Sequence, residues 1–262
     1  MTISSTRPDR ATAVSWVAPV GVTFWALKLL TTAFGEAASD GLAGISPALA
    51  VLVGVAGIVI TLRWQTRSHS FVARRYWSAV AAVAVFGTML ADGLHVALGL
   101  PYPVTSVLYA VATASVFVVW RRCEGTISIH DIFTVRRERF YWAAVMCTFA
   151  LGTAVGDLTA ATLGLGYWPS AVLFAILIAI PALVWRATGR HEVLWFWCAY
   201  VLTRPLGASI ADGLAKPASM GRGMGLGDVP VACIIGLLLV GAVVLFAGPG
   251  GRPAAPRRQG VS

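Results

Sequence analysis

Long apolar runs alternate with short polar connections along the chain. Eight runs of about 20 residues can be distinguished, and a helix needs about 20 residues to cross a hydrocarbon core of about 30 Å. The runs cover 17–42, 46–63, 72–98, 103–120, 139–163, 168–185, 192–215 and 229–247. This pattern predicts an all-α, polytopic membrane bundle of eight transmembrane helices in contact with the lipid bilayer.

Composition agrees with a membrane protein. Hydrophobic residues make up 58% of the chain and charged residues 12%, where a soluble domain has about 25% charged residues. The net charge is +9, but the position of the basic residues matters more here than their number, so we expect no nucleic-acid partner. The four cysteines are far apart and form no C-x-x-C pair, which indicates neither disulfides nor a metal site. No cofactor is expected.

The basic residues lie mostly in every second connection. These connections and the two ends of the chain lie on one side of the predicted bundle. They carry 16 of the 20 Lys and Arg residues: Arg7, Arg10, Arg63, Arg67, Arg74, Arg75, Arg121, Arg122, Arg136, Arg137, Arg139, Arg186, Arg190, Arg252, Arg257 and Arg258. The positive-inside rule places such connections in the cytoplasm. We therefore predict a bacterial inner-membrane protein with a cytoplasmic N-terminal tail (1–16), a transmembrane domain (17–247) and a disordered cytoplasmic C-terminal tail (248–262).

An internal repeat organises the apolar runs. The pattern W-x9-G-x4-D occurs four times, on the first, third, fifth and seventh runs. Its members are Trp25, Gly35 and Asp40; Trp77, Gly87 and Asp92; Trp142, Gly152 and Asp157; and Trp197, Gly207 and Asp212. Because every motif lies on a run that crosses in the same direction, we predict four parallel two-helix repeats, at about 17–63, 72–120, 139–185 and 192–247.

Each motif forms a polar stripe on its helix. At 3.6 residues per turn, the tryptophan, the residue after the glycine and the aspartate lie within about 60° of one another. Lys28, Glu36 and Arg204 extend this line. A carboxylate that faces lipid costs several kcal/mol. We therefore predict that the motif helices form the core with their polar residues inward, and that the more uniformly apolar helices face lipid.

Acidic residues outnumber basic ones within the spans, since Glu36 and the four aspartates stand against Lys28 and Arg204. Such an excess in a low dielectric binds protons or recruits a cation. These seven residues are therefore the predicted substrate- or ion-binding site. Alternatively, the carboxylates only cap helix ends, or pair with the two cations as contacts between helices.

The other motif positions allow two interpretations each. The glycines permit close helix packing or mark a hinge where the helix unwinds, and Pro205 is expected to kink the seventh helix. The four tryptophans either anchor the protein at the membrane interface or line the interior of the bundle.

The tandem motif, with Leu-Thr-Arg-Pro-Leu-Gly at 202–207 and Leu-Gly-Leu-Gly-Tyr at 163–167, resembles a bacterial family of uncharacterised membrane-anchored proteins. That family is built from tandem two-transmembrane-helix repeats of unknown function. The resemblance covers about residues 17–247 and implies an architecture without an assigned activity. The first and fourth repeats lack the Leu-Gly-Leu-x-Tyr element of the middle two.

We therefore expect a transporter of a small cation or of a proton-coupled small solute, with a ring of intramembrane aspartates as its binding site. The alternative is a structural or sensory membrane protein without transport activity. An enzyme is not expected, because the chain shows no Cys/His pair, serine nucleophile or H-E-x-x-H helix.

Overall fold

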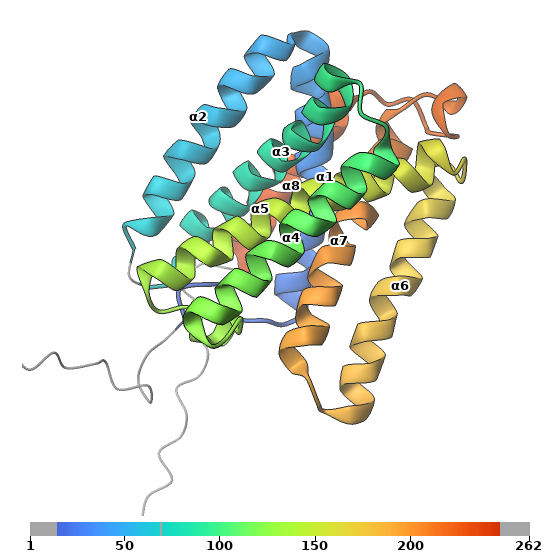
Figure 1. Cartoon of the computed structure of the whole chain (residues 1–262). Helices are drawn as coiled ribbons and strands as arrows, with labels where there is room; N and C mark the ends of the chain where they lie inside the picture. Colours follow the sequence, from blue (N-terminus) through green and yellow to red (C-terminus); the bar gives the residue numbers. More distant parts are fainter. Residues whose placement is uncertain (1–14, 69, 247–262) are drawn as a thin grey trace, which may run out of the picture.

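Eight long helices make up the computed structural model, which describes residues 15–68 and 70–246 (Figure 1). They are α1 (Val22–Ile45), α2 (Pro47–Thr66), α3 (Ala73–Leu98), α4 (Tyr102–Glu124), α5 (Val135–Asp157), α6 (Tyr167–Thr188), α7 (Glu192–Ala215) and α8 (Asp228–Phe246). The connections contain the short helical turns η1 (Ile129–Asp131), η2 (Leu158–Thr162) and η3 (Ala218–Met220). The described residues contain no strand, and the predicted helical membrane bundle is confirmed.

Seven of the eight helices, α2 to α8, are long and apolar enough to cross a membrane. The remaining helix, α1, has 24 residues, which is sufficient length for a crossing, but it carries Lys28, Glu36 and Asp40. The chain is therefore a multi-pass membrane protein. The predicted tails 1–16 and 248–262 lie outside the described residues, except for residues 15 and 16.

The first helix begins later than the apolar pattern indicates, at Val22 rather than at residue 17. Pro19 explains the difference, because proline disfavours a helical conformation in the residue before it. The preceding segment instead crosses one end of the bundle, where the Trp16 backbone N–H donates to the Ile132 carbonyl at 2.8 Å. Val17 and Ala18 are buried there, so these apolar residues belong to the core without being helical.

The four motif helices, α1, α3, α5 and α7, pack in a closed ring. Helix α1 contacts α3, α3 contacts α5, α5 contacts α7, and α7 contacts α1. A motif glycine lies at each of these contacts, where an added Cβ would overlap the neighbouring helix. The four pairs are Gly35 with Ala84, Gly87 with Phe149, Gly152 with Arg204, and Gly207 with Thr32. Each partner lies three residues before the next glycine, so the same contact is repeated around the ring.

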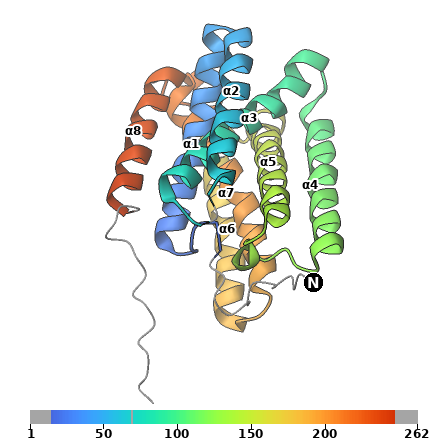
Figure 2. The ribbon, with the colours of Figure 1, turned by 90° about the vertical axis from the view of Figure 1, so that its left-hand side faces the viewer.

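The four covering helices, α2, α4, α6 and α8, surround this ring. Each packs mainly on the motif helix of the following repeat: α2 on α3, α4 on α5, α6 on α7, and α8 on α1. Figure 2 shows α4 and α8 on opposite flanks of the bundle. Large apolar side chains are exposed on each covering helix, for example Leu52, Val111, Leu183 and Leu237. Such surfaces suit contact with lipid.

The two ends of the bundle differ in charge. The arginine end holds the α2–α3, α4–α5 and α6–α7 connections; Arg74 and Arg137 lie in the first turns of α3 and α5, and Arg190 lies in the α6–α7 connection. The aspartate end holds the opposite connections and the four motif aspartates, near the top of Figure 1 where α1 joins α2.

Candidate functional site

A single buried guanidinium joins all four motif helices. Arg204 on α7 is 1% exposed, and its Nη2 donates to Glu36 Oε2 at 2.5 Å, to Thr153 Oγ1 at 2.8 Å and to Thr88 Oγ1. Its Nη1 donates to the Thr32 carbonyl at 2.7 Å. Glu36, Thr88 and Thr153 each follow the glycine of their own repeat. The predicted polar stripes therefore meet at the centre of the ring.

Helix α7 remains one helix around this residue. It runs from Glu192 to Ala215 and includes Pro205, which lies against Gly152 of α5. Ala208 occupies the position after the glycine in this repeat, where the other three repeats have Glu36, Thr88 and Thr153.

The second predicted cation, Lys28, occupies a different environment. Its side chain is 1% exposed, and its Nζ lies 3.9 Å from the ring centroid of Phe149 and 4.2 Å from that of Tyr200. The Phe149 ring also contacts Arg204, whose Cζ lies 5.4 Å from the same centroid. Within the described part of the chain, Lys28 Nζ has no hydrogen-bond partner. Glu36 thus pairs with Arg204 and leaves Lys28 among aromatic rings.

Carboxylates gather at the aspartate end. Oxygen atoms of Glu36, Asp40 and Asp212 lie within 4.8 Å of one another, and such hard oxygen ligands are suited to a metal cation. Asp92 and Asp157 are within electrostatic reach of Glu36 and Asp40. The sequence therefore identified residues that lie near one another in the structure, although it predicted no metal site.

A third cation, Lys216, lies beside this cluster and was not among the predicted site residues. Its Nζ pairs with Asp40 Oδ2 at 2.6 Å and with Asp228 Oδ1 at 2.8 Å. Burial alone would lower the pKa of Lys216, but the two carboxylates outweigh it and hold the pKa above the ordinary lysine value. Lys216 therefore stays charged at neutral pH. In the sequence, Lys216 is only a lone lysine in a loop, and no motif marks it.

The loop after α7 fixes the position of Lys216. Backbone N–H groups of 224–227 donate to the last three carbonyls of α7 and to the carbonyl of Lys216, which follows the helix; Met224 donates to Gly213 at 2.8 Å and Gly225 to Lys216 at 2.8 Å. Helix ends otherwise leave such carbonyls without partners. The ordered loop therefore holds the ammonium group next to Asp40.

The motif tryptophans lie at the arginine end. Trp77, Trp142 and Trp197 are buried, and Trp25 is partly buried. The Trp197 Nε1 donates to the Ile127 carbonyl at 2.9 Å. These indoles thus pack inside the protein.

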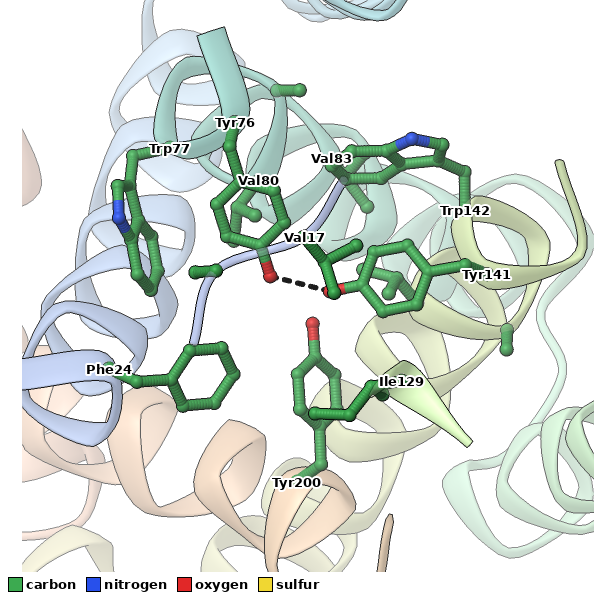
Figure 3. Packing of buried hydrophobic residues seen from close by; sticks show 14 of the residues in the cluster. Val17, Phe24, Tyr76, Trp77, Val80, Val83, Ile129, Tyr141, Trp142 and Tyr200 are labelled. Carbon is green, nitrogen blue, oxygen red and sulfur yellow. Dashed lines mark hydrogen bonds between the residues drawn. The ribbon is translucent and has the colours of Figure 1, made fainter. Parts of the chain in front are cut away.

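Three tyrosine hydroxyls point toward one another in the core, near Trp77 and Trp142 (Figure 3). The Tyr76 and Tyr141 hydroxyl oxygens are 2.6 Å apart, and the Tyr200 hydroxyl points toward this pair. All three side chains are 1% exposed. Sequence reasoning missed this cluster, although Tyr76 and Tyr141 occupy the aromatic position that precedes each motif tryptophan.

The helices differ in how they continue beyond the aspartates. Helices α1, α3 and α7 remain α-helical through Asp40, Asp92 and Asp212. In the third repeat, α5 ends at Asp157 and continues as the π-helical turn η2. Such turns are frequent at functional sites.

Motif aspartates line none of the following three cavities in the described part of the chain. A cavity of about 230 Å³ at the arginine end is bounded by α6, α7 and η1. One of about 450 Å³ lies between the connections at 160–167 and 220–222. One of about 570 Å³ is an apolar groove between α1 and α8.

Fold and site together define a multi-pass helical membrane protein whose polar residues converge inside a ring of four repeats. The chain belongs to the family described as Repeat of Unknown Function (DUF347), whose profile matches residues 75–126, 140–191 and 195–249. The predicted resemblance is thus confirmed. The matches cover the last three repeats; the first repeat keeps the motif spacing and the ring contacts outside the matched ranges. No curated protein and no solved structure matches the chain.

Proposed function

We propose that this protein carries a small cation, or a small solute together with a proton, across the membrane, and that the carboxylates at the aspartate end bind the cation or proton. The observation that carries this proposal is the excess of carboxylates over cations there. Arg204 pairs with Glu36, and Lys216 is shared by Asp40 and Asp228. An unbalanced set of carboxylates in a low dielectric favours uptake of a cation or proton.

Three aspartates supply that excess. Among the residues described, the side chains of Asp92, Asp157 and Asp212 form no hydrogen bond or ion pair. They come from three different repeats, and Asp212 is 6% exposed. A bound cation would give these oxygens the partner that buried charges require. The role we propose is binding and movement of a solute rather than catalysis.

Uptake into liposomes tests this proposal. The purified protein would be reconstituted and its uptake of Na⁺, K⁺, Mg²⁺ and small organic cations measured, alone and with a pH gradient. We expect Asp92→Asn, Asp157→Asn and Asp212→Asn each to lower uptake at least about tenfold, because removing one charged partner at a buried site costs about 2–5 kcal/mol. Asp131→Asn, in η1 at the arginine end, is the matched control and should transport normally. Uptake that is unchanged in all three variants would refute the proposal.

We further propose that both termini lie in the cytoplasm of a bacterial cell and that the aspartate end faces outward across the inner membrane. The concentration of arginines at the other end supports this orientation. In intact cells of a cysteine-free variant, a membrane-impermeant thiol reagent should label a cysteine introduced at Ser219 but not one at Arg190. Labelling at Arg190 alone would reverse the orientation.

A structural role is the second candidate, because Arg204 links all four motif helices. In that case the polar stripes would hold the ring together without binding a solute. The Asp→Asn variants would then change the unfolding temperature, and the wild-type protein would take up none of the tested solutes.

A further inference from the structure

A line of buried polar groups runs inside the ring of motif helices. It begins at Glu138 near the arginine end, continues through the three tyrosine hydroxyls and Lys28, and ends at the Arg204–Glu36 pair below the aspartates. Every group on it is at most 3% exposed. Buried polar groups cost free energy unless they are satisfied, so a line through the whole core is not expected from packing alone.

The part near the arginine end contains two groups of hydrogen bonds, one around Glu138 and one between two tyrosines. Glu138 Oε1 accepts from Gln65 Nε2 at 3.2 Å and from Trp142 Nε1 at 3.4 Å. Tyr141 follows Glu138 by three residues, on the same face of α5. Its hydroxyl bonds to that of Tyr76. Hydroxyl groups both donate and accept, so this tyrosine pair can pass a proton from one oxygen to the other.

Lys28 lies between this set and the carboxylates. Its Nζ rests on the rings of Phe149 and Tyr200, and the Arg204 guanidinium from α7 contacts the same Phe149 ring. An ammonium group carries three donors, and none of them finds an acceptor among the described residues. A lysine that served only as a contact between helices would be expected to have an acceptor.

Buried threonines lie about one helical turn closer to the motif glycines than Lys28 does. Thr31, Thr148 and Thr203 each precede the motif glycine by four residues and donate to a carbonyl of their own helix at 2.7–2.8 Å. Their oxygen lone pairs remain available to accept a hydrogen bond. They therefore extend the polar line from Lys28 toward Arg204.

The same region opposes the passage of a metal cation. Arg204 places a guanidinium on this axis, and the rings of Phe149 and Tyr200 lie against Lys28. A hydrated cation would meet fixed positive charge and close packing, whereas a proton needs only groups that exchange it. None of the three cavities lies on this axis.

We propose that the proton is the coupling ion and that Lys28 is its binding group inside the bundle. A proton taken up by the carboxylates at the aspartate end is relayed past Glu36 and the threonine hydroxyls to the Lys28 amine, which becomes an ammonium group. The ammonium then releases this proton toward the arginine end, where the tyrosine hydroxyls relay it and the Glu138 carboxylate accepts it before it leaves to the solvent. Carboxylate and amine are regenerated, so protons balance. This inference rests on the proposed transport function.

Proton flux in liposomes tests it. Vesicles that enclose a pH-sensitive dye would receive a membrane potential from K⁺ and valinomycin. We expect the wild-type protein to change the internal pH and both Lys28→Met and Lys28→Arg to lower the rate at least tenfold. Arginine preserves charge and ring contacts but does not release its proton. Arg190→Met, in the connection at the arginine end, should retain the full rate.

The outcomes separate this inference from the proposed function. Undiminished proton flux in Lys28→Arg would overturn the inference. So would cation uptake by the wild-type protein without proton movement, and the proposed function would then stand. Absence of any uptake would refute the proposed function itself. Thermal unfolding of each variant distinguishes lost transport from lost folding.

A second measurement does not depend on transport. The chain contains two lysines, Lys28 and Lys216, so ¹⁵N-lysine labelling gives two side-chain nitrogen signals. The signal that disappears in Lys28→Met should move between ammonium and amine positions as pH is varied within the range where the protein stays folded. A Lys28 signal that stays at the ammonium position throughout would contradict a proton-carrying role.

Discussion

At the scale of single residues, the most consequential contact is the ion pair between Arg204 and Glu36. Both side chains are at most 3% exposed, and the guanidinium also satisfies Thr88, Thr153 and the Thr32 carbonyl. Pairing of two buried charges roughly offsets the cost of removing them from water, while loss of one partner leaves the other uncompensated. The network therefore acts as a unit.

This leads to a prediction about coupling between the two residues. Arg204→Met should lower the free energy of unfolding by about 3–5 kcal/mol, because Glu36 is left charged and buried. The double variant Arg204→Met/Glu36→Gln should recover part of that loss. Denaturation in detergent micelles, arranged as a double-mutant cycle, measures the coupling. Strictly additive effects would mean that the pair does not interact in the folded protein.

At the scale of the helices, the motif glycines set the spacing of the ring. A Cβ at Gly35 would lie 2.5 Å from Ala84 Cβ and 2.7 Å from the Ala84 backbone carbonyl carbon. Backbone atoms cannot move aside as a flexible side chain can. The interface between α1 and α3 therefore requires glycine at this position.

A matched pair of substitutions tests this requirement. Gly35→Ala should destabilise the protein by about 1–3 kcal/mol through overpacking. Gly57→Ala, on the covering helix α2, has open space around the added methyl group and should be neutral or stabilising by about 0.5–1 kcal/mol, since alanine favours helices. Unfolding temperatures in one detergent provide the comparison. Equal effects at both positions would argue against a glycine-dependent interface.

The helices and the inward polar stripe could be predicted from the sequence because both depend on periodicity. The environments of the individual side chains could not. Tyr200 occupies a position where the other repeats carry Lys28, Val80 and Val145, so no repeated pattern marks it. The partner of Lys216 depends on how a loop folds back over α7. Likewise, the choice of Arg204 rather than Lys28 as the partner of Glu36 depends on packing in three dimensions.

At the scale of the whole molecule, the four two-helix repeats pack in the same way around a closed ring. Helix α8 covers α1 as α2 covers α3, α4 covers α5 and α6 covers α7, so the last repeat completes the first. The connections between repeats lie at the arginine end, where α1 also begins and α8 ends. The packing of the ring therefore does not determine between which two repeats the N- and C-termini lie.

A circular permutant tests whether the ring closes through equivalent contacts. Joining residue 262 to residue 1 and opening the chain in the α2–α3 connection, at Ser70, preserves every helix and leaves both new termini at the arginine end. We expect this permutant to insert and to unfold within a few degrees of the parent, because long surface connections cost little additional entropy. Opening in the α3–α4 connection moves both termini to the aspartate end, so the N-terminus would have to cross to the opposite side of the membrane, and we expect this permutant to fail to insert correctly. Insertion is measured by thiol labelling at Ser219, and stability by thermal unfolding. A permutant opened at Ser70 that inserts but loses its cooperative transition would show that the α8–α1 contact is not equivalent to the other three.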